Sequence, residues 1–259
     1  MIQAKKSLGQ NFLQSDKALR QISEAADLSE KDFVIEIGPG EGALTEKLLA
    51  TGATVYAIEK DDRLIPLLNE KFSSEIQDGK FHLIHEDVLK VDIEKLLENK
   101  KYKLIANIPY YITGMILELF LSTKHKPEKI VLLVQKEVAE RIVSRDGKES
   151  ILSMSVKLYG VPKIIDRVPR GAFRPIPNVD SAIILIDEIN RKDKKVITPE
   201  IENKFFTTIK KAFGQRRKQI GNTLGVTDEQ ISKINKNLSS KTRPEELSVK
   251  DWLSLCEIL

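Results

Sequence analysis

Asn107-Ile108-Pro109-Tyr110 is a tetrad whose groups suit chemistry on an amino group conjugated to an aromatic ring, and it directly follows the apolar, strand-like run 102–106. Such a nitrogen is a poor nucleophile because its lone pair is delocalised. The amide oxygen of Asn107 and a main-chain carbonyl, for which we choose Ile108, can accept both amine hydrogens and localise the lone pair. Pro109 fixes the turn, and Tyr110 offers a ring for base stacking. The tetrad predicts methylation of such an amine, with a plain strand-ending turn as the alternative.

A glycine-rich loop at 38–42 follows the apolar run 33–37 and predicts a nucleotide site. Glycines at alternate positions allow a sharp turn and close approach of a ligand, although tight turns of this kind also occur without one. Glu59 ends the second apolar run, where an acid can accept hydrogen bonds from ribose hydroxyls. Asp87 ends the third run and can accept from an adenine amino group.

Two cofactors suit this layout, and the loop discriminates between them. Nicotinamide dinucleotides prefer G-x-G-x-x-G, whereas this loop reads G-x-G-x-G and is preceded by Glu36. A carboxylate would repel a pyrophosphate but favours the sulfonium and ammonium groups of S-adenosylmethionine. Asp87 and Asn107 have no role in the dinucleotide pattern. We therefore predict S-adenosylmethionine, with a nicotinamide oxidoreductase as a remote alternative.

The net charge of +4 comes from residues 186–259, because residues 1–185 hold equal numbers of basic and acidic side chains. Residues 203–227 contain six cations and no acid, and a second basic segment opens the chain. Charge runs are usually solvated faces, which is the alternative here. Two basic segments around a base-modifying site favour an RNA phosphate backbone as the partner. The residues that we expect to bind RNA are Lys5, Lys6, Lys210, Lys211, Arg216, Arg217 and Lys218.

Apolar runs alternate with helical patterns over most of the chain, which indicates βαβ units, an α/β fold and a mostly parallel sheet. We expect strands at 33–37, 54–59, 81–85, 102–106, 129–135, 161–168 and 179–186. Helices are expected at 15–26, 43–51, 62–72, 92–99, 112–123 and 136–144. Helical patterns alone follow the polar linker 190–195, at 199–213, 216–224, 227–237 and 248–258, the last with a capping box of Ser248 and Asp251.

We expect two domains: a methyltransferase domain over 1–188, opened by an arm and helix at 1–26, and a helical RNA-binding domain over 196–259. Composition is ordinary for a globular protein, with 41% hydrophobic and 31% charged residues. No apolar stretch approaches the roughly 18 residues that a membrane span needs, and the N-terminal residues lack a signal-peptide core. The single Cys256 excludes internal disulfides. We expect a cytoplasmic monomer that binds no metal.

With these residues in view, the chain resembles the ribosomal RNA adenine N6,N6-dimethyltransferases, most closely their bacterial small-subunit branch. The resemblance covers nearly the whole chain, and its motifs are specific in combination. They are the segments 6–13, 36–42, 107–110, 173–181 and 243–248, together with Glu59 and Asp87.

The resemblance implies a Rossmann-like class I methyltransferase with a seven-stranded sheet, its last strand antiparallel, and a small helical C-terminal domain. It implies cofactor contacts at Asn11, Leu13, Gly38, Glu59, Asp87 and Asn107. It also places Phe173 across from Tyr110, so that a flipped adenine stacks between two rings, although Phe173 could equally be a simple anchor. The implied substrate is 16S rRNA in the immature small subunit, at two adjacent adenosines of a hairpin loop near the 3′ end.

Two rivals to this function remain at the level of sequence. Macrolide-resistance methyltransferases share the motifs but act on large-subunit RNA; the ending 243–248 and the form of the segment 8–13 favour the small-subunit enzyme. A non-catalytic RNA-binding or ribosome-assembly factor could keep the same fold. The intact set of Glu59, Asp87 and the tetrad argues against such a non-catalytic role.

Overall fold

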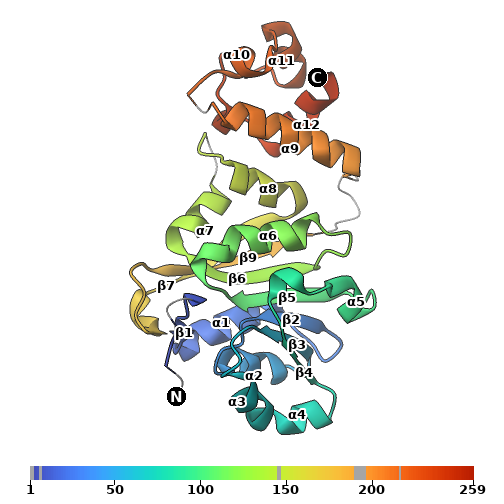
Figure 1. Ribbon diagram of the computed structural model, residues 1–259. Coiled ribbons are helices and arrows are strands. Elements are labelled where there is room, and N and C mark those ends of the chain that lie inside the picture. The colour runs from blue at the N-terminus through green and yellow to red at the C-terminus, as the bar shows by residue number, and fades with distance from the viewer. Residues whose placement is uncertain (1–2, 6–7, 145–146, 190–196, 216) are drawn as a thin grey trace. The chain divides into compact units, whose positions relative to one another are not determined.

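The computed structural model spans residues 1–259 and describes all of them except 1–2, 6–7, 145–146, 190–196 and 216 (Figure 1). The chain divides into two compact units. The first comprises Met1–Ala139 and Val161–Ile189, and the second comprises Glu140–Gly160 and Asn190–Leu259. The second unit thus includes residues 140–160, which the expected boundary kept with the N-terminal part. The functional division at 188 and 196 stays a prediction.

A seven-stranded sheet forms the centre of the first unit, in the order β4-β3-β2-β5-β6-β9-β7. Only β9 runs antiparallel to its neighbours β6 and β7, as the resemblance implied. The strands are β2 (Phe33–Ile37), β3 (Thr54–Glu59), β4 (Phe81–His85), β5 (Tyr102–Asn107), β6 (Lys129–Gln135), β7 (Val161–Val168) and β9 (Ser181–Asp187). The central strands are apolar and buried nearly throughout, as expected for strands covered on both faces.

Helices cover this sheet and supply its apolar layers (Figure 1). Helix α1 (Asp16–Ala26) begins where Ser15 Oγ accepts from the Ala18 amide, and it packs across β5, β6 and β7. Its buried residues join α2 and α3 in one hydrophobic cluster. Alternate strand residues point to the opposite face, where the rings of Tyr102 and Phe120 of α6 lie 6.4 Å apart. The remaining helices of this part are α2 (Ala43–Leu49), α3 (Ile65–Lys71), α4 (Ser73–Gln77), α5 (Ile93–Leu97) and α6 (Thr113–Ser122), with short 3-10 turns at Val88–Lys90, Tyr110–Ile112 and Arg170–Ala172. Helix α7 (Lys136–Val143) begins in the first unit and ends in the second.

A separate two-stranded sheet joins two distant motifs. Strand β1 (Phe12–Leu13) pairs antiparallel with β8 (Phe173–Arg174), so that Leu13 lies opposite Phe173. The amide of Gln14 also donates to the carbonyl of Ala172 at 2.8 Å. The N-terminal segment is thereby fixed to the segment that precedes β9.

The second unit is helical. Its elements are α8 (Ile151–Tyr159), α9 (Pro199–Phe213), α10 (Ile220–Leu224), α11 (Asp228–Ile234), a 3-10 turn at Pro244–Glu246 and α12 (Val249–Ile258). Helix α9 packs against α8, α10 and α12, and the rings of Phe213 and Trp252 lie 6.1 Å apart in its core. The capping box of Ser248 and Asp251 is confirmed.

The expected strands all occur, with ends within two residues of those predicted. Two helices were not expected. Helix α4 buries no side chain, so it leaves no apolar signal in the sequence. Helix α8 buries Met154, Val156 and Leu158 at alternate positions, a spacing more typical of a strand. The linker 190–195 lies outside the described residues.

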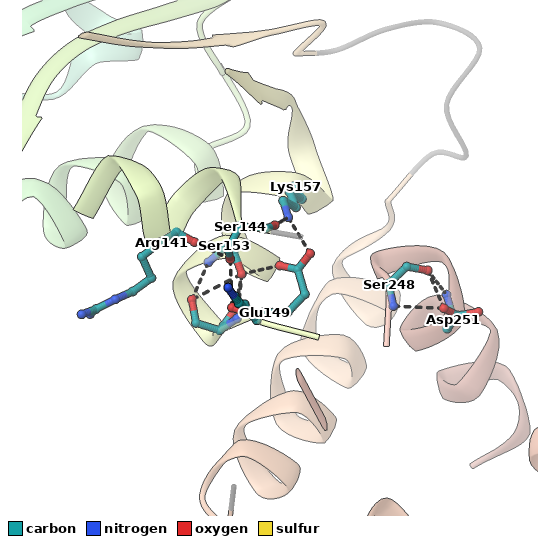
Figure 2. Close-up of polar contacts among 9 residues, drawn as sticks. Arg141, Ser144, Glu149, Ser153, Lys157, Ser248 and Asp251 are labelled. Carbon is teal, nitrogen blue, oxygen red and sulfur yellow. Dashed lines mark hydrogen bonds and ion pairs between the residues drawn. The ribbon is translucent and has the colours of Figure 1, made fainter. Parts of the chain in front are cut away.

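A buried polar network opens α8 (Figure 2). Lys157 Nζ lies 2.6 Å from Glu149 Oε1 and also donates to the carbonyl of Ser144. Ser153 Oγ donates to Glu149 Oε2 at 2.6 Å. Glu149 is only 8% exposed, so the lysine and the serine together compensate its desolvation.

Lys157→Met should destabilise the second unit by about 2 kcal/mol, because it leaves a buried carboxylate without its cation. Lys233→Met is the matched control, since Lys233 forms an exposed ion pair with Glu229 inside α11. That control should cost less than about 0.5 kcal/mol. Urea unfolding of the two variants measures the difference, and equal losses would contradict the role given to the network.

Candidate active site

A pocket of about 480 Å³ opens at the carboxyl ends of β2, β3, β4 and β5. The chain proceeds from β2 outward to β3 and β4, and then returns to β5 on the other side of β2. This reversal of strand order is where open parallel sheets bind ligands. The pocket collects the glycine loop, the acids that end β3 and β4, the tetrad and the N-terminal segment from Leu8 to Gln14.

The glycine loop is held in conformations that side chains disfavour. Gly38, Gly40 and Gly42 have φ values of 65°, 60° and 82°. A Cβ on Gly40 would lie 3.0 Å from the ring of Phe12, and one on Gly42 would lie 2.6 Å from the ring of Phe72. The alternate glycines therefore admit a sharp turn and a close approach of the N-terminal segment.

Glu36 is a buried carboxylate on the pocket wall, with 1% exposure. Its Oε2 accepts from Thr45 Oγ1 at 2.7 Å, while its Oε1 has no hydrogen-bond partner among the residues described. Burial, with a smaller contribution from the nearby Glu59, raises the pKa of Glu36 to about 8. Because Oε1 is desolvated and lacks a partner among the described residues, a positively charged ligand beside it would be favourable.

Glu59 ends β3 and is 6% exposed. Its two oxygens accept from the amides of Asp61 at 2.8 Å and Gly40 at 3.3 Å. Burial raises the pKa of this carboxyl despite those bonds. The backbone thus aims the carboxylate along the pocket edge, where the sequence analysis expected an acceptor for ribose hydroxyls.

Asp87 also lines the pocket, but its oxygens already have partners. Oδ2 lies 2.7 Å from Lys60 Nζ, and Oδ1 accepts from the amide of Leu89 at 3.1 Å. The hydrogen bond from Lys60 lowers the pKa of the carboxyl. Asp87 is therefore ionised and fixed, and a ligand amine would share an oxygen that already accepts one bond.

Asn107, the last residue of β5, lies beside the glycine loop, because Ile37 and Ala106 are paired in the parallel ladder. Its Nδ2 donates to the carbonyl of Asn11 at 3.3 Å. With the amide nitrogen engaged, the amide oxygen is the atom left to accept a hydrogen from a ligand. Asn11 and Leu13 line the same pocket, so the structure brings together all six expected cofactor residues.

The two aromatic residues expected to stack on a base, Tyr110 and Phe173, differ in their location. Tyr110 lines the pocket, and its hydroxyl is 2.7 Å from Ser181 Oγ, which fixes the ring. Burial raises the pKa of that hydroxyl. Phe173 does not line the pocket; it is 3% exposed and packs in the core cluster, so its stacking role stays a prediction. Tyr111 lines the pocket with 65% exposure and was not considered from the sequence.

Most of the cations that we expect to bind RNA belong to the second unit, whereas the pocket residues belong to the first. Lys210 and Lys211 occupy the last turn of α9, and Arg217 and Lys218 follow it. All four are exposed, and none pairs with an acid within the described part of the chain. Lys5 is also exposed. The predictions for Lys6 and Arg216 fall outside the described residues.

A polar cluster around Asp61, which includes the pocket residue Gln10, was not predicted from the sequence. Asp61 accepts hydrogen bonds from Gln10, which is 51 positions away in the sequence, and from the guanidinium of Arg63, which belongs to no motif. Its only sequence signal is its position two residues after Glu59. In the part of the chain that is described, no group of three or more acids, histidines or cysteines is arranged to hold a metal, and no described helix is long and apolar enough to cross a membrane.

Strand order, the antiparallel last strand, the glycine loop and the acids ending β3 and β4 together define a class I methyltransferase. The sequence profile of the family "Ribosomal RNA adenine dimethylase" matches residues 1–259. The chain therefore belongs to the ribosomal RNA adenine dimethylase family, and the resemblance seen in its motifs is confirmed. It is an rRNA adenine dimethyltransferase.

Curated relatives agree over nearly the whole chain. Ribosomal RNA small subunit methyltransferase A of Dehalococcoides mccartyi (strain CBDB1) is 42% identical and aligns with 98% of this chain and 88% of its own length. The protein of the same name from Fusobacterium nucleatum is 39% identical, with 98% and 97% covered.

Solved structures show the same fold. The 23S rRNA methyltransferase ErmE superposes with a TM-score of 0.79 at 25% identity, covering 95% of this chain and 98% of that one. A dimethyladenosine transferase from Plasmodium falciparum gives 0.76 at 26% identity, with 94% and 95% covered.

Glu36→Gln should stabilise the ligand-free protein at high pH. The folded pKa of Glu36 is about 8 against a usual value of 4.5, so the folded state holds more protons and loses stability as the pH rises from 4.5 to 8. Relative to wild type, the variant should gain about 3 kcal/mol between pH 5 and pH 8, since each pKa unit is worth about 1.4 kcal/mol.

Denaturant unfolding of both proteins at the two pH values measures this gain. The exposed Glu118→Gln serves as the control and should follow wild type at both pH values. A Glu36→Gln curve that stays parallel to wild type would contradict the assigned protonation.

Proposed function

We propose that the protein uses S-adenosylmethionine to dimethylate N6 of two adjacent adenosines in a 3′-terminal hairpin loop of 16S rRNA, in the immature small ribosomal subunit. The observation that carries the proposal is the fixed amide of Asn107, with its oxygen left to accept, beside a nucleotide pocket. The choice of the small subunit is supported by relatives of about 40% identity that are named for it.

The residues on the pocket wall fit this cofactor. The orphaned Oε1 of Glu36 suits a ligand that carries positive charge, and a negatively charged pyrophosphate would be repelled there. Glu59 would accept from the ribose hydroxyls and Asp87 from the adenine amine. Asn11, Leu13 and Gly38 would complete the cofactor contacts.

The tetrad would prepare the target nitrogen. The carbonyls of Pro109 and Tyr110 already accept from Ile112 N and Thr113 Oγ1. This leaves the carbonyl of Ile108 as the second acceptor beside the amide oxygen of Asn107, which supports the choice made from the sequence. Accepting both N6 hydrogens would direct the nitrogen lone pair toward the cofactor side of the pocket.

When bound, S-adenosylmethionine supplies an electrophilic methyl group on a cationic sulfur. N6 would take that methyl group while the sulfur keeps the electron pair of the broken bond, and the methylated amine, made more acidic by its positive charge, would release its proton to solvent. The protein's residues contribute position and oriented dipoles rather than a strong base. The second transfer requires cofactor exchange, and the singly methylated nitrogen retains one hydrogen for Asn107 or Ile108 to accept.

A flipped adenine would stack on Tyr110, whose ring is held by its bond to Ser181. Base–aromatic stacking is worth roughly 1–3 kcal/mol, comparable to the few kcal/mol needed to unstack a nucleotide. Phe173 would complete a sandwich only after its ring leaves the core. The exposed ring of Tyr111 offers a further surface at the pocket mouth.

The substrate is tested by labelled-methyl transfer to immature small subunits, large subunits and free RNA. The proposal expects transfer to small subunits, with two methyl groups on each of two adenosines. Preferential labelling of large subunits would instead support the macrolide-resistance type, and the 23S rRNA methyltransferase ErmE shows that an enzyme acting on large-subunit RNA can share this fold. Absence of transfer to every substrate would favour a binding factor.

Asn107→Ala should reduce methyl transfer at least about a hundredfold, the effect expected when an electrostatic contact to the reacting group is removed. Binding to small subunits should change less than about twofold, because the target amine is the one RNA group that the Asn107 side chain is proposed to contact. Transfer rates and filter binding measured on one preparation separate the two effects. Methylation at near wild-type rate would refute the mechanism.

The four described C-terminal cations should contact phosphates that fix register rather than identify bases. Replacing Lys210, Lys211, Arg217 and Lys218 by Gln should weaken RNA binding. It should also flatten the dependence of log K on log salt by about 0.7–0.9 for each phosphate that is no longer neutralised. Titrations at several salt concentrations give the slope. Lys233→Gln, which removes a cation paired with Glu229, should leave it unchanged, and an unchanged slope in the fourfold variant would refute the assignment.

A further inference from the structure

Residues 8–13, here called the strap, contact three parts of the candidate active site. The ring of Phe12 lies against Gly40, where a Cβ would be 3.0 Å away. Gly9 packs against Tyr111, with a corresponding distance of 3.1 Å. The carbonyl of Asn11 accepts from Asn107 Nδ2. One short segment therefore touches the glycine loop, the catalytic amide and the mouth of the pocket.

The C-terminal end of the strap is held by the pairing of β1 with β8 and by the buried Leu13, and Gln10 holds its middle through a buried acid. Gln10 Nε2 donates to Asp61 Oδ2 at 2.8 Å, across 51 positions of sequence. Asp61 is 1% exposed, and Arg63 binds both of its oxygens, with Nε 2.9 Å from Oδ1 and Nη2 2.5 Å from Oδ2. Gln10 Oε1 in turn accepts from the amide of Lys5 at 2.8 Å. The anchor is thus a rigid, charged and buried acceptor.

The orientation of Asn107 depends on this anchored strap. An asparagine amide can flip about its Cβ–Cγ bond, so that its oxygen and its NH2 group change places with little change in shape. Among the described residues, the carbonyl of Asn11 is the one partner that distinguishes the two orientations. If the amide turned, its NH2 would face the hydrogens of the target amine, and two sets of donors would oppose each other.

We propose that Gln10 is a positioning residue for methyl transfer: its hydrogen bond to Asp61 holds the strap, and the strap keeps the Asn107 amide oxygen directed at the target amine. This inference rests on the proposed function, because it assigns to Gln10 the support of a residue with a proposed catalytic role. Gln10 also lines the pocket, but its side-chain nitrogen and oxygen are engaged by Asp61 and by the amide of Lys5, so the role proposed for it is to position Asn107.

Gln10→Met tests the anchor, because methionine has nearly the same shape and lacks the donor. The variant should lower kcat about tenfold and increase hydrogen exchange of the strap amides, with the melting temperature nearly unchanged. Gln77→Met is the matched control, since Gln77 is exposed at the end of α4. It should leave kcat and strap exchange at wild-type values.

A double-mutant cycle with Asn107→Asp tests whether Gln10 acts through Asn107. Aspartate keeps an oxygen that can accept from the target amine but has no NH2 for the Asn11 carbonyl, so its orientation no longer depends on the strap. In the Asn107→Asp background, Gln10→Met should therefore lower kcat less than about twofold. Residues that act through one another show this non-additivity.

Three outcomes would overturn the inference: an unchanged kcat in Gln10→Met, unchanged exchange of the strap amides, or an equal fold loss in both backgrounds. Failure of the proposed function has a different signature. In that case the wild-type protein would not methylate rRNA at all, while hydrogen exchange would still report whether Gln10 anchors the strap.

Discussion

The parallel pairing of β2 with β5 is the constraint on which the rest of the site depends. Because Ile37 lies opposite Ala106, the glycine loop and Asn107 must emerge side by side at the same edge of the sheet. The reversal of strand order at this point opens the pocket between them. The backbone pairing thereby places the proposed cofactor site beside Asn107, and the antiparallel β9 brings Ser181 within hydrogen-bond distance of the Tyr110 hydroxyl.

The acids of the pocket have different electrostatic environments, which shift their pKa values in opposite directions. Burial leaves Glu36 desolvated, with one oxygen that has no partner among the described residues; this arrangement costs stability, and a cation beside that oxygen would offset the cost. Asp87 has the opposite environment, since Lys60 keeps it ionised. Active sites commonly retain such locally unfavourable groups, with stability supplied by the remainder of the fold. Here the large apolar core of the first unit has that role.

Much of this architecture was predictable because local patterns determine it. Strand β6 is apolar from Ile130 to Val134; Glu59 ends β3 as expected, and Asp87 follows the end of β4 by two residues. Long-range pairings were not predictable. The bond from Gln10 to Asp61 and the burial of Phe173 depend on tertiary packing, which no sequence period records. Helix α8 was missed because its apolar residues from Leu152 to Leu158 alternate with polar ones, as in a strand.

The central claim is that the Asn107 tetrad activates the exocyclic nitrogen of an adenine. Its most direct test is nucleoside mass spectrometry of small-subunit rRNA after incubation with the purified protein and S-adenosylmethionine. The account predicts N6,N6-dimethyladenosine as the final product, formed by way of N6-methyladenosine. Methyl groups on a ring nitrogen, on a ribose hydroxyl or on another base would contradict it.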